Sequence, residues 1–343
     1  MGDKMKAAVL VDEGNLQVLS VEKPKIKNSN DILIQVECCA ICGSDVSAIS
    51  VPRRHPVTYN TIIGHEYVGK IVEMGDSVSG FSIGERVVVE PNIACGKCAM
   101  CKNGHTNMCP NIKLTGFHYN GGMAEFSVMP DTQVHKIRDQ SVQAKRVVLT
   151  EPLACVISSL AKLKIQIGDY CVVLGAGPIG LMYTELLKAY GAGKVIVSVR
   201  SARHKSAVEA LGAIVVDPGK DNLNEFVKAQ TDGLGADIVI DCVGGLMTDA
   251  VSCCAVGGQV MLFGLNEAKE NHLIPFDLTR REISVAGSYI TKKSFPRAIR
   301  VIEDGVVKLD KIVTHIFDLE NIQSGFQAIK NGEAIKVVIQ CHK

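Results

Sequence analysis

The sequence predicts an α/β protein with a strand-rich first part, followed by a doubly wound parallel sheet. Three observations predict this fold class. Short β-rich runs fill residues 1–150, strand and helix patterns alternate from about residue 153, and a glycine-rich turn joins the first strand of the second part to its helix. At 343 residues the chain is long enough for two domains of ordinary size.

In the first part, four runs of mostly apolar and β-branched residues are bounded by turn-forming residues. Such boundaries around an apolar run are typical of strands. The predicted strands cover residues 4–11, 31–41, 66–75 and 84–91.

In the second part, apolar runs alternate with helical patterns, as in a parallel, doubly wound sheet. The helix that opens this part has proline near its start and glycine at its end. A further helix and a strand–helix–strand pattern complete the chain after residue 289. The predicted strands are 170–177, 194–200, 236–245, 259–265 and 282–290, and the predicted helices are 178–193, 201–213, 221–231 and 294–305.

The composition argues against several classes of protein. With 47% hydrophobic and 21% charged residues, the chain resembles a soluble globular protein. Its formal charge of +1 gives no reason to expect nucleic acid or a membrane as a partner, and no stretch approaches the roughly 18 apolar residues of a membrane helix. Thirteen cysteines, an odd number, without a secretion signal indicate reduced thiols. We therefore expect a cytoplasmic protein.

The segment VVLGAGPIG carries the pattern G-x-G-x-x-G between a strand and a helix. Gly175 allows the tight turn, Gly177 lets backbone N–H groups reach a pyrophosphate, and Gly180 lets helix and strand pack closely. Pro178 and Ile179 complete the turn. A glycine-rich turn without a ligand is the alternative, but the strand–helix–strand context favours a dinucleotide site.

Two groups of residues offer metal-binding side chains. Spacing alone leaves open two disulfides, an iron–sulfur cluster or a zinc site for the first group, Cys95, Cys98, Cys101 and Cys109. The second group is Cys42, His65 and Glu66, which offer a thiolate, an imidazole and a carboxylate. Taken singly, Cys42 could be a small core residue and His65 a hydrogen-bonded surface histidine.

Together these motifs resemble the zinc-dependent medium-chain alcohol and polyol dehydrogenases, the family of sorbitol dehydrogenase. The match rests on Gly-His-Glu at 64–66 with glycines at 69 and 75, Cys-Gly-Ser-Asp at 42–45, the four cysteines and the glycine turn. It follows the family's order over essentially the whole chain.

The resemblance implies a domain organisation and an assembly. A GroES-like β-barrel catalytic domain would cover residues 1–152 and 291–343, and a Rossmann domain would cover residues 153–290. The active site is expected in the cleft between the domains, and the protein is expected to be a homotetramer.

The resemblance also implies two zinc ions per chain. The four cysteines of 95–109 match a structural zinc site, which four thiolates would close. At the catalytic zinc, Cys42 and His65 match ligands and Glu151 occupies the third ligand position. Glu66 matches a neighbouring carboxylate that can alternate with Glu151, and Asp45 matches the carboxylate that receives the histidine N–H.

The family's reaction is hydride transfer between an alcohol and a nicotinamide cofactor, with zinc acting as a Lewis acid. Ser44 matches the first proton carrier. Family members often have a histidine three residues later, where this chain has Ser47, so water or the cofactor ribose would have to complete the proton path.

The residues expected near the substrate depart from the polyol pattern. Polyol enzymes have an aromatic residue at the position of Ala48 and an arginine at that of Ile290. Here a nearby loop instead carries Arg53, Arg54 and His55. These cations could simply be solvated, or they could bind an anionic substrate such as a sugar phosphate or sugar acid.

The turn after the second strand of the dinucleotide domain predicts the cofactor. Val199 stands where NAD-dependent relatives have an acidic residue that binds the adenosine ribose. Arg200, Ser201, Arg203 and His204 supply donors suited to the 2′-phosphate of NADP(H). We therefore predict a preference for NADP(H). The alternative is that these cations are exposed at the start of a helix and bind no phosphate.

Three other functions fit parts of the sequence. A zinc-free quinone or enoyl reductase of the same fold would not need Cys42, His65 and Glu151. A non-catalytic redox sensor or structural zinc protein would bind metal or cofactor without turnover. A zinc-ribbon nucleic-acid binder is disfavoured because the cysteine segment holds two lysines and no aromatic residue. We therefore expect a zinc-dependent enzyme that acts on a small-molecule alcohol, polyol or ketone.

Overall fold

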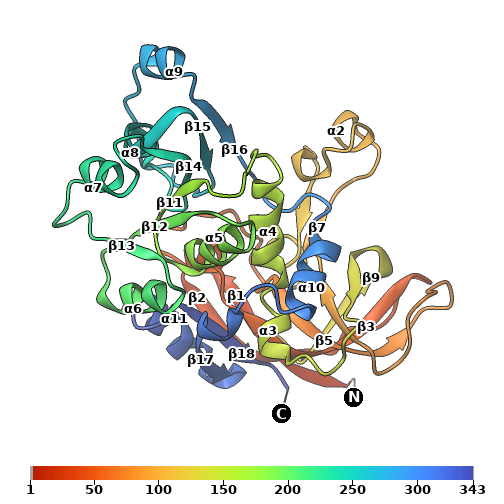
Figure 1. Cartoon of the computed structure of the whole chain (residues 1–343). Helices are drawn as coiled ribbons and strands as arrows, with labels where there is room; N and C mark the ends of the chain where they lie inside the picture. Colours follow the sequence, from red (N-terminus) through yellow and green to blue (C-terminus); the bar gives the residue numbers. More distant parts are fainter. Residues whose placement is uncertain (1–2, 343) are drawn as a thin grey trace. The chain divides into compact units, whose positions relative to one another are not determined.

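The computed structural model describes residues 3–342 and divides into two compact units (Figure 1). The first unit extends to Ala154 and includes Thr291–Asp304 and the stretch from Val313 onward. The second unit comprises Cys155–Ile290 and Gly305–Ile312.

The first unit consists mainly of antiparallel strands. Its described strands are β1 (Lys4–Asp12), β2 (Asn15–Glu22), β3 (Asp31–Ala40), β4 (Thr61–Ile62), β5 (Glu66–Met74), β6 (Arg86–Val89), β7 (Asn92–Ile93), β8 (Lys113–Leu114), β9 (Phe126–Pro130), β10 (Val134–Lys136), β17 (Val313–Asp318) and β18 (Lys336–Gln340). One sheet has the order β2–β1–β4, and a larger one has the order β10–β6–β5–β3–β18–β17, with β9 also paired to β3. Strand β3 thus pairs with three other strands, β5, β9 and β18, and is antiparallel to each of them.

Short helices join these strands, and an amphipathic helix covers part of the larger sheet. The helices are α1 (Gly43–Ala48), α2 (Ala99–Lys102), η1 (Thr106–Met108), η2 (Asp131–Gln133), α3 (Ala144–Val147), α10 (Phe295–Glu303), η4 (Leu319–Asn321) and α11 (Ile322–Lys330). Helix α4 (Thr150–Leu160) begins in this unit and continues into the second. Helix α11 packs on β17 and β18 and buries Ile322, Phe326 and Ala328. Ile322 and Phe326 lie four residues apart, about one helical turn, so they share one apolar face that packs on the sheet.

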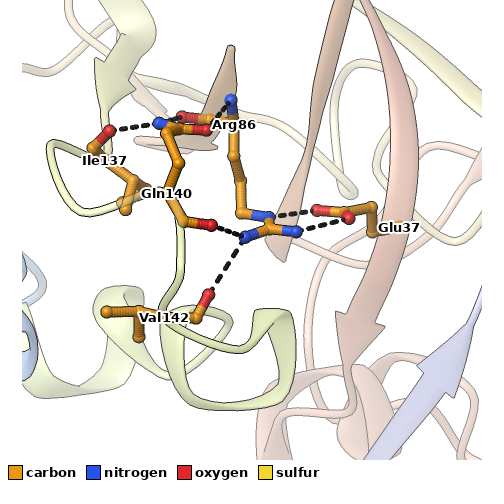
Figure 2. A network of polar contacts seen from close by, with 5 residues as sticks. All are labelled: Glu37, Arg86, Ile137, Gln140 and Val142. Carbon is orange, nitrogen blue, oxygen red and sulfur yellow. Dashed lines mark hydrogen bonds and ion pairs between the residues drawn. The ribbon is translucent and has the colours of Figure 1, made fainter. Parts of the chain in front are cut away.

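A polar network ties the segment after β10 to the centre of the first unit (Figure 2). Arg86 donates to both carboxylate oxygens of Glu37 on β3, from Nε at 2.6 Å and from Nη2 at 2.9 Å. Its Nη1 donates to the carbonyls of Gln140 at 2.7 Å and Val142 at 3.0 Å. This fork fixes the segment that leads into α3 and α4.

The second unit is built on a parallel six-stranded sheet. Its strands are β11 (Tyr170–Leu174), β12 (Lys194–Ser198), β13 (Ile214–Val216), β14 (Ala236–Asp241), β15 (Cys254–Leu262) and β16 (Ser284–Gly287). Its helices are α5 (Pro178–Ala189), α6 (Ala202–Ala210), α7 (Leu223–Gln230), α8 (Met247–Cys253), α9 (Pro275–Arg281) and η3 (Leu309–Lys311). The sheet order β13–β12–β11–β14–β15–β16 is the doubly wound order 3-2-1-4-5-6. The predicted α/β class and parallel sheet are therefore confirmed.

The structure adds elements that the sequence interpretation did not include, chiefly β2 and α4. The run 236–245 was predicted as one strand, but β14 ends at Asp241. The Asp241 carboxylate accepts hydrogen bonds from the backbone of Val243, Gly244 and Leu246, which turns the chain out of the sheet. Within residues 3–342, no helix is long and apolar enough to cross a membrane.

Candidate active site and metal centres

Cys42 lies at the start of helix α1 and is held there by Asp45. The Oδ2 atom of Asp45 accepts a hydrogen bond from the Cys42 backbone N–H at 2.9 Å. Asp45 is fully buried at the third position of the helix, so this reciprocal cap fixes the half-buried Cys42 to a residue of the interior.

His65 is positioned by the glycine before it and by the same aspartate. Gly64 has a φ of 91°, and a Cβ there would lie 2.6 Å from Met123 Cγ and 2.7 Å from Cys39 Sγ. Only glycine fits this turn. The Nδ1 atom of His65 lies 3.3 Å from Asp45 Oδ1, an ionic contact without hydrogen-bond alignment, which leaves Nε2 available as a ligand.

The charges around His65 favour a cation at this place. Burial alone lowers the pKa of His65, but the Asp45 carboxylate and the Cys42 thiol outweigh burial and raise the pKa well above its usual value. A positive charge is therefore stabilised among these side chains, as a metal ion requires.

Glu66 begins β5 and is paired with Lys336, a residue that sequence reasoning missed. Lys336 Nζ lies 2.8 Å from Oε1 and 2.6 Å from Oε2 of Glu66, and both side chains are buried. Strand pairing brings the two side chains together. Glu66 on β5 and Val338 on β18 both lie opposite Ala40 of β3, and Lys336 is two residues before Val338 and therefore on the same face of β18. The sequence does contain a sign of this buried charge, because a single lysine stands within the apolar run AIKVVIQ.

The structure brings Cys42, His65 and Glu66 together. Their possible ligand atoms all lie within 4.8 Å of one another. A thiolate, an imidazole and a carboxylate form a donor set suited to zinc. Glu151 lies outside this group and is buried in the first turn of α4. Burial lowers the pKa of Lys336, whereas the charges of Glu66, Cys42 and, last in size, Glu151 raise it.

An aromatic side chain adjoins His65, one of the candidate metal ligands. The centroid of the Phe117 ring lies 5.1 Å from that of His65 and 4.5 Å from that of His55. Sequence reasoning did not identify Phe117 as part of this site. Ser44, the expected first proton carrier, is half-buried on α1 two residues after Cys42.

The second cysteine group forms a separate cluster around α2. The sulfur atoms of Cys95, Cys98, Cys101 and Cys109 lie within 4.8 Å of one another, and none of these cysteines is in a disulfide. Backbone N–H groups of residues 97 and 98 lower the pKa of Cys95 to about 6, whereas burial and neighbouring thiols raise the pKa of Cys101 to about 12. Four converging thiols suit a closed tetrahedral zinc site.

The glycine turn has the geometry that a dinucleotide needs. Gly175 has a φ of 103°, and a Cβ on Gly180 would lie 1.9 Å from the Gly175 carbonyl oxygen. A Cβ on Gly177, in contrast, would meet no atom within 4 Å, so the space beside this residue is open. Pro178, which has no N–H, and Ile179 begin α5; the N–H groups in the first turn of a helix have no partner within the helix, which favours an anion there.

The five residues predicted to select the cofactor follow β12 directly. Val199 is buried and donates its N–H to the Val216 carbonyl, while Arg200 and Arg203 are exposed and Ser201 is half-buried at the start of α6. His204 is turned inward: its Nε2 is buried without a hydrogen-bond partner, and burial followed by the charge of Arg203 lowers its pKa. Arg200 and Arg203 thus offer the accessible cations of this turn.

Comparisons with known proteins agree with this arrangement. The model of the alcohol dehydrogenase GroES-like domain matches residues 28–139, and the model of the zinc-binding dehydrogenase family matches residues 178–304. A sorbitol dehydrogenase of Halalkalibacterium halodurans is 32% identical over 98% of this chain and 99% of its own length. A D-arabitol-phosphate dehydrogenase of Enterococcus avium is 31% identical over 90% of this chain and 89% of its own.

Solved structures extend the similarity to the whole fold. A zinc-binding dehydrogenase from Sinorhizobium meliloti 1021, crystallised with NADP, superimposes with a TM-score of 0.94. It is 31% identical to this chain, and the match covers 98% of this chain and 99% of that one. The predicted combination of a GroES-like domain with a Rossmann domain is confirmed.

Proposed function

Because the chain belongs to the zinc-dependent medium-chain alcohol and polyol dehydrogenase family, we propose that it transfers a hydride between a secondary alcohol or polyol, or the matching ketone, and NADP(H). The observation that carries this proposal is the group Cys42, His65 and Glu66, in which the histidine and the glutamate are buried and the donor atoms converge within 4.8 Å.

Zinc at this site would act as a Lewis acid that makes the alcohol proton easier to remove. Cys42 and His65 are its proposed protein ligands, with Glu151 as the third and Glu66 as the carboxylate that alternates with it. Asp45 orients His65 and Cys42 together, because its two oxygens face one residue each. Lys336 holds Glu66 through both oxygens and so opposes its approach to the metal.

Ser44 is the proposed acceptor of the alcohol proton. It lies on α1 beside Cys42, in a half-buried position from which a hydroxyl can exchange protons with water. Ser47 follows one turn later and is also half-buried, so water or the cofactor ribose is the proposed next carrier.

NADP(H) is the proposed cofactor because of the turn after β12. No carboxylate stands at Val199, and the exposed guanidinium groups of Arg200 and Arg203 suit a 2′-phosphate, which Ser201 can also bind. The open space beside Gly177 is the proposed place of the pyrophosphate.

We also propose a structural zinc at Cys95, Cys98, Cys101 and Cys109, a homotetramer and a cytoplasmic location. Between residues 3 and 342 no disulfide joins two cysteines, which supports a reducing compartment. Strand β16 is an edge strand, and exposed apolar residues such as Phe276 lie in the same unit, which supports contact with another copy of the chain.

The proposal is tested by steady-state assays of the purified protein with simple secondary alcohols, polyols, sugar acids and sugar phosphates, each with NADP and NAD. Zinc-dependent oxidation of at least one compound is expected, with loss of turnover after removal of the metal by a chelator and recovery with added zinc. A protein that binds zinc and NADPH but oxidises or reduces nothing would instead favour the non-catalytic sensor.

A further inference from the structure

We propose that the substrate carries an anionic group, a phosphate or a carboxylate, that binds at a basic rim formed by Arg54, His55, Lys113 and His118. This inference rests on the proposed function, since it names the class of alcohol that the site would take. The argument depends on where the rim lies, which hydrogen-bond donors it offers and which charges surround it.

The rim lies next to the metal ligands. The ring centroid of His55 is 4.5 Å from that of Phe117 at an interplanar angle of 40°, and Phe117 is 5.1 Å from His65 at 41°. Two ring-to-ring contacts thus lead from a metal ligand to the basic loop. A sugar chain of several carbons can span this distance, with its reacting hydroxyl at the metal and its charged end at the rim.

Backbone hydrogen bonds fix the loop in this place. Arg54 N–H donates to the carbonyl of Ser47 at 2.9 Å, which ties the loop to the helix that begins beside Cys42. Thr58 N–H donates to the carbonyl of Phe117 at 2.8 Å. The loop is therefore attached on both sides to elements of the candidate active site.

The hydrogen bonds of the two histidines define their free donors. His118 Nδ1 accepts the backbone N–H of Leu114 at 3.1 Å, so its hydrogen is on Nε2. His55 Nδ1 lies 2.9 Å from the Pro56 carbonyl, which can only accept, so Nδ1 carries a hydrogen. Nε2 of His118 is therefore a donor that an anion can use, and Nε2 of His55 is one when both ring nitrogens carry a hydrogen.

The rim is rich in positive charge that the protein itself does not neutralise. Between residues 3 and 342, no ion pair joins Arg54, His55, Lys113 or His118 to a carboxylate. Burial and then the charges of Lys113 and His55 lower the pKa of His118, which places these three groups within electrostatic reach of one another. An anionic ligand would relieve this repulsion.

The structure assigns a different part to Arg53. Its Nη1 donates to the Val57 carbonyl at 3.2 Å, and its guanidinium lies over the Tyr59 ring at 5.3 Å from the centroid. Its backbone N–H donates to Glu13. Arg53 thus holds the loop in place, and the contacts to the anion fall to the four residues of the rim.

The test compares three substrates of equal carbon length on the zinc-loaded enzyme: a neutral polyol, the same polyol with a terminal phosphate, and the corresponding sugar acid. We expect one anionic substrate to exceed the polyol in kcat/KM by at least ~100-fold at low salt, because charge-assisted contacts are strong and are screened by salt. The phosphate and acid arms show which anion the rim selects. Equal kcat/KM for the polyol and both anions would overturn the proposal while leaving the dehydrogenase function intact.

Variants locate the effect at the rim. His55→Gln should raise KM for the anionic substrate at least ~10-fold, and by more than it raises KM for the polyol, because the contact that is lost lies outside the reacting centre. His315→Gln is the matched control, since His315 also packs its ring on a phenylalanine, Phe317, at 6.1 Å on β17. Unchanged KM for the anion in His55→Gln would contradict the assignment.

A binding experiment decides the case in which no compound of the panel is turned over, an outcome that would refute the proposed function. Inorganic phosphate is titrated calorimetrically into the zinc-loaded wild-type protein and the His55→Gln variant. Saturable binding that weakens at least ~10-fold in the variant would support the anion site independently of activity. Absence of phosphate binding, or equal binding by both proteins, would overturn it.

Discussion

Lys336 and Glu66 form a buried ion pair in which the ammonium lies 2.8 Å and 2.6 Å from the two carboxylate oxygens. The residues are far apart in the sequence and meet because β5 and β18 both pair with β3. Burial alone lowers the pKa of Lys336, but Glu66 and Cys42 outweigh it and raise the pKa. Lys336 therefore keeps its charge, and it holds the carboxylate of the candidate metal site.

Replacing Lys336 by Met should destabilise the protein by about 3–5 kcal/mol, because it leaves the Glu66 charge buried and unpaired. Urea denaturation of the two proteins measures this change. Lys6→Met is the control, since Lys6 forms an exposed pair with Glu320, and its loss should cost much less stability than the loss of the buried pair. An equal decrease in the free energy of unfolding of the two variants would show that the buried pair stabilises the protein no more than the exposed pair does.

Asp45→Asn should lower zinc affinity at the catalytic site about 10- to 100-fold, the range found when a group that orients a metal ligand is changed. The amide oxygen can still accept the Cys42 N–H, but the charge facing His65 is lost. Chelator competition measures the affinity, with Asp131→Asn as a control on η2. Unchanged affinity would mean that Asp45 serves only to cap the helix.

The glycine turn offers a pair of substitutions with opposite consequences. Gly180→Ala should destabilise the second unit by about 1–3 kcal/mol, because its Cβ would lie 1.9 Å from the Gly175 carbonyl. Gly177→Ala should fold normally but raise KM for NADP at least ~10-fold by filling space next to the proposed pyrophosphate. Denaturation and kinetics distinguish the two, and normal cofactor affinity in Gly177→Ala would contradict this placement.

The cofactor preference should depend on Arg200. We expect wild-type kcat/KM to favour NADP over NAD by at least ~10-fold, or about 1.4 kcal/mol. Arg200→Ala should remove most of this preference while sparing turnover with NAD, and Lys205→Ala, an exposed cation further along α6, should not. A wild-type enzyme that prefers NAD would refute the interpretation that the residues after β12 bind the 2′-phosphate of NADP.

The sequence predicted best what depends on neighbouring residues. The glycine turn and the apolar runs around it determine the parallel sheet locally, so its class and most of its strands were predicted. Cys42, His65 and Glu66 stand in short motifs, and the structure brings their side chains together.

The missed features depend on contacts between distant segments. Lys336 becomes part of the site only through strand pairing, and Phe117 only through its ring contacts with His55 and His65. Helix α4 was missed because Pro152 interrupts a helical pattern, although proline is tolerated in a first turn.

The most direct test of the account measures zinc content and turnover on the same preparations of wild type and Cys42→Ser. We predict about two zinc ions per wild-type chain, one at each donor group, and about one in the variant. Turnover of the variant should fall at least ~100-fold, because the Lewis acid is lost from the reacting centre. A Cys42→Ser enzyme that keeps wild-type turnover, or a wild-type chain that is fully active with one zinc, would contradict the account.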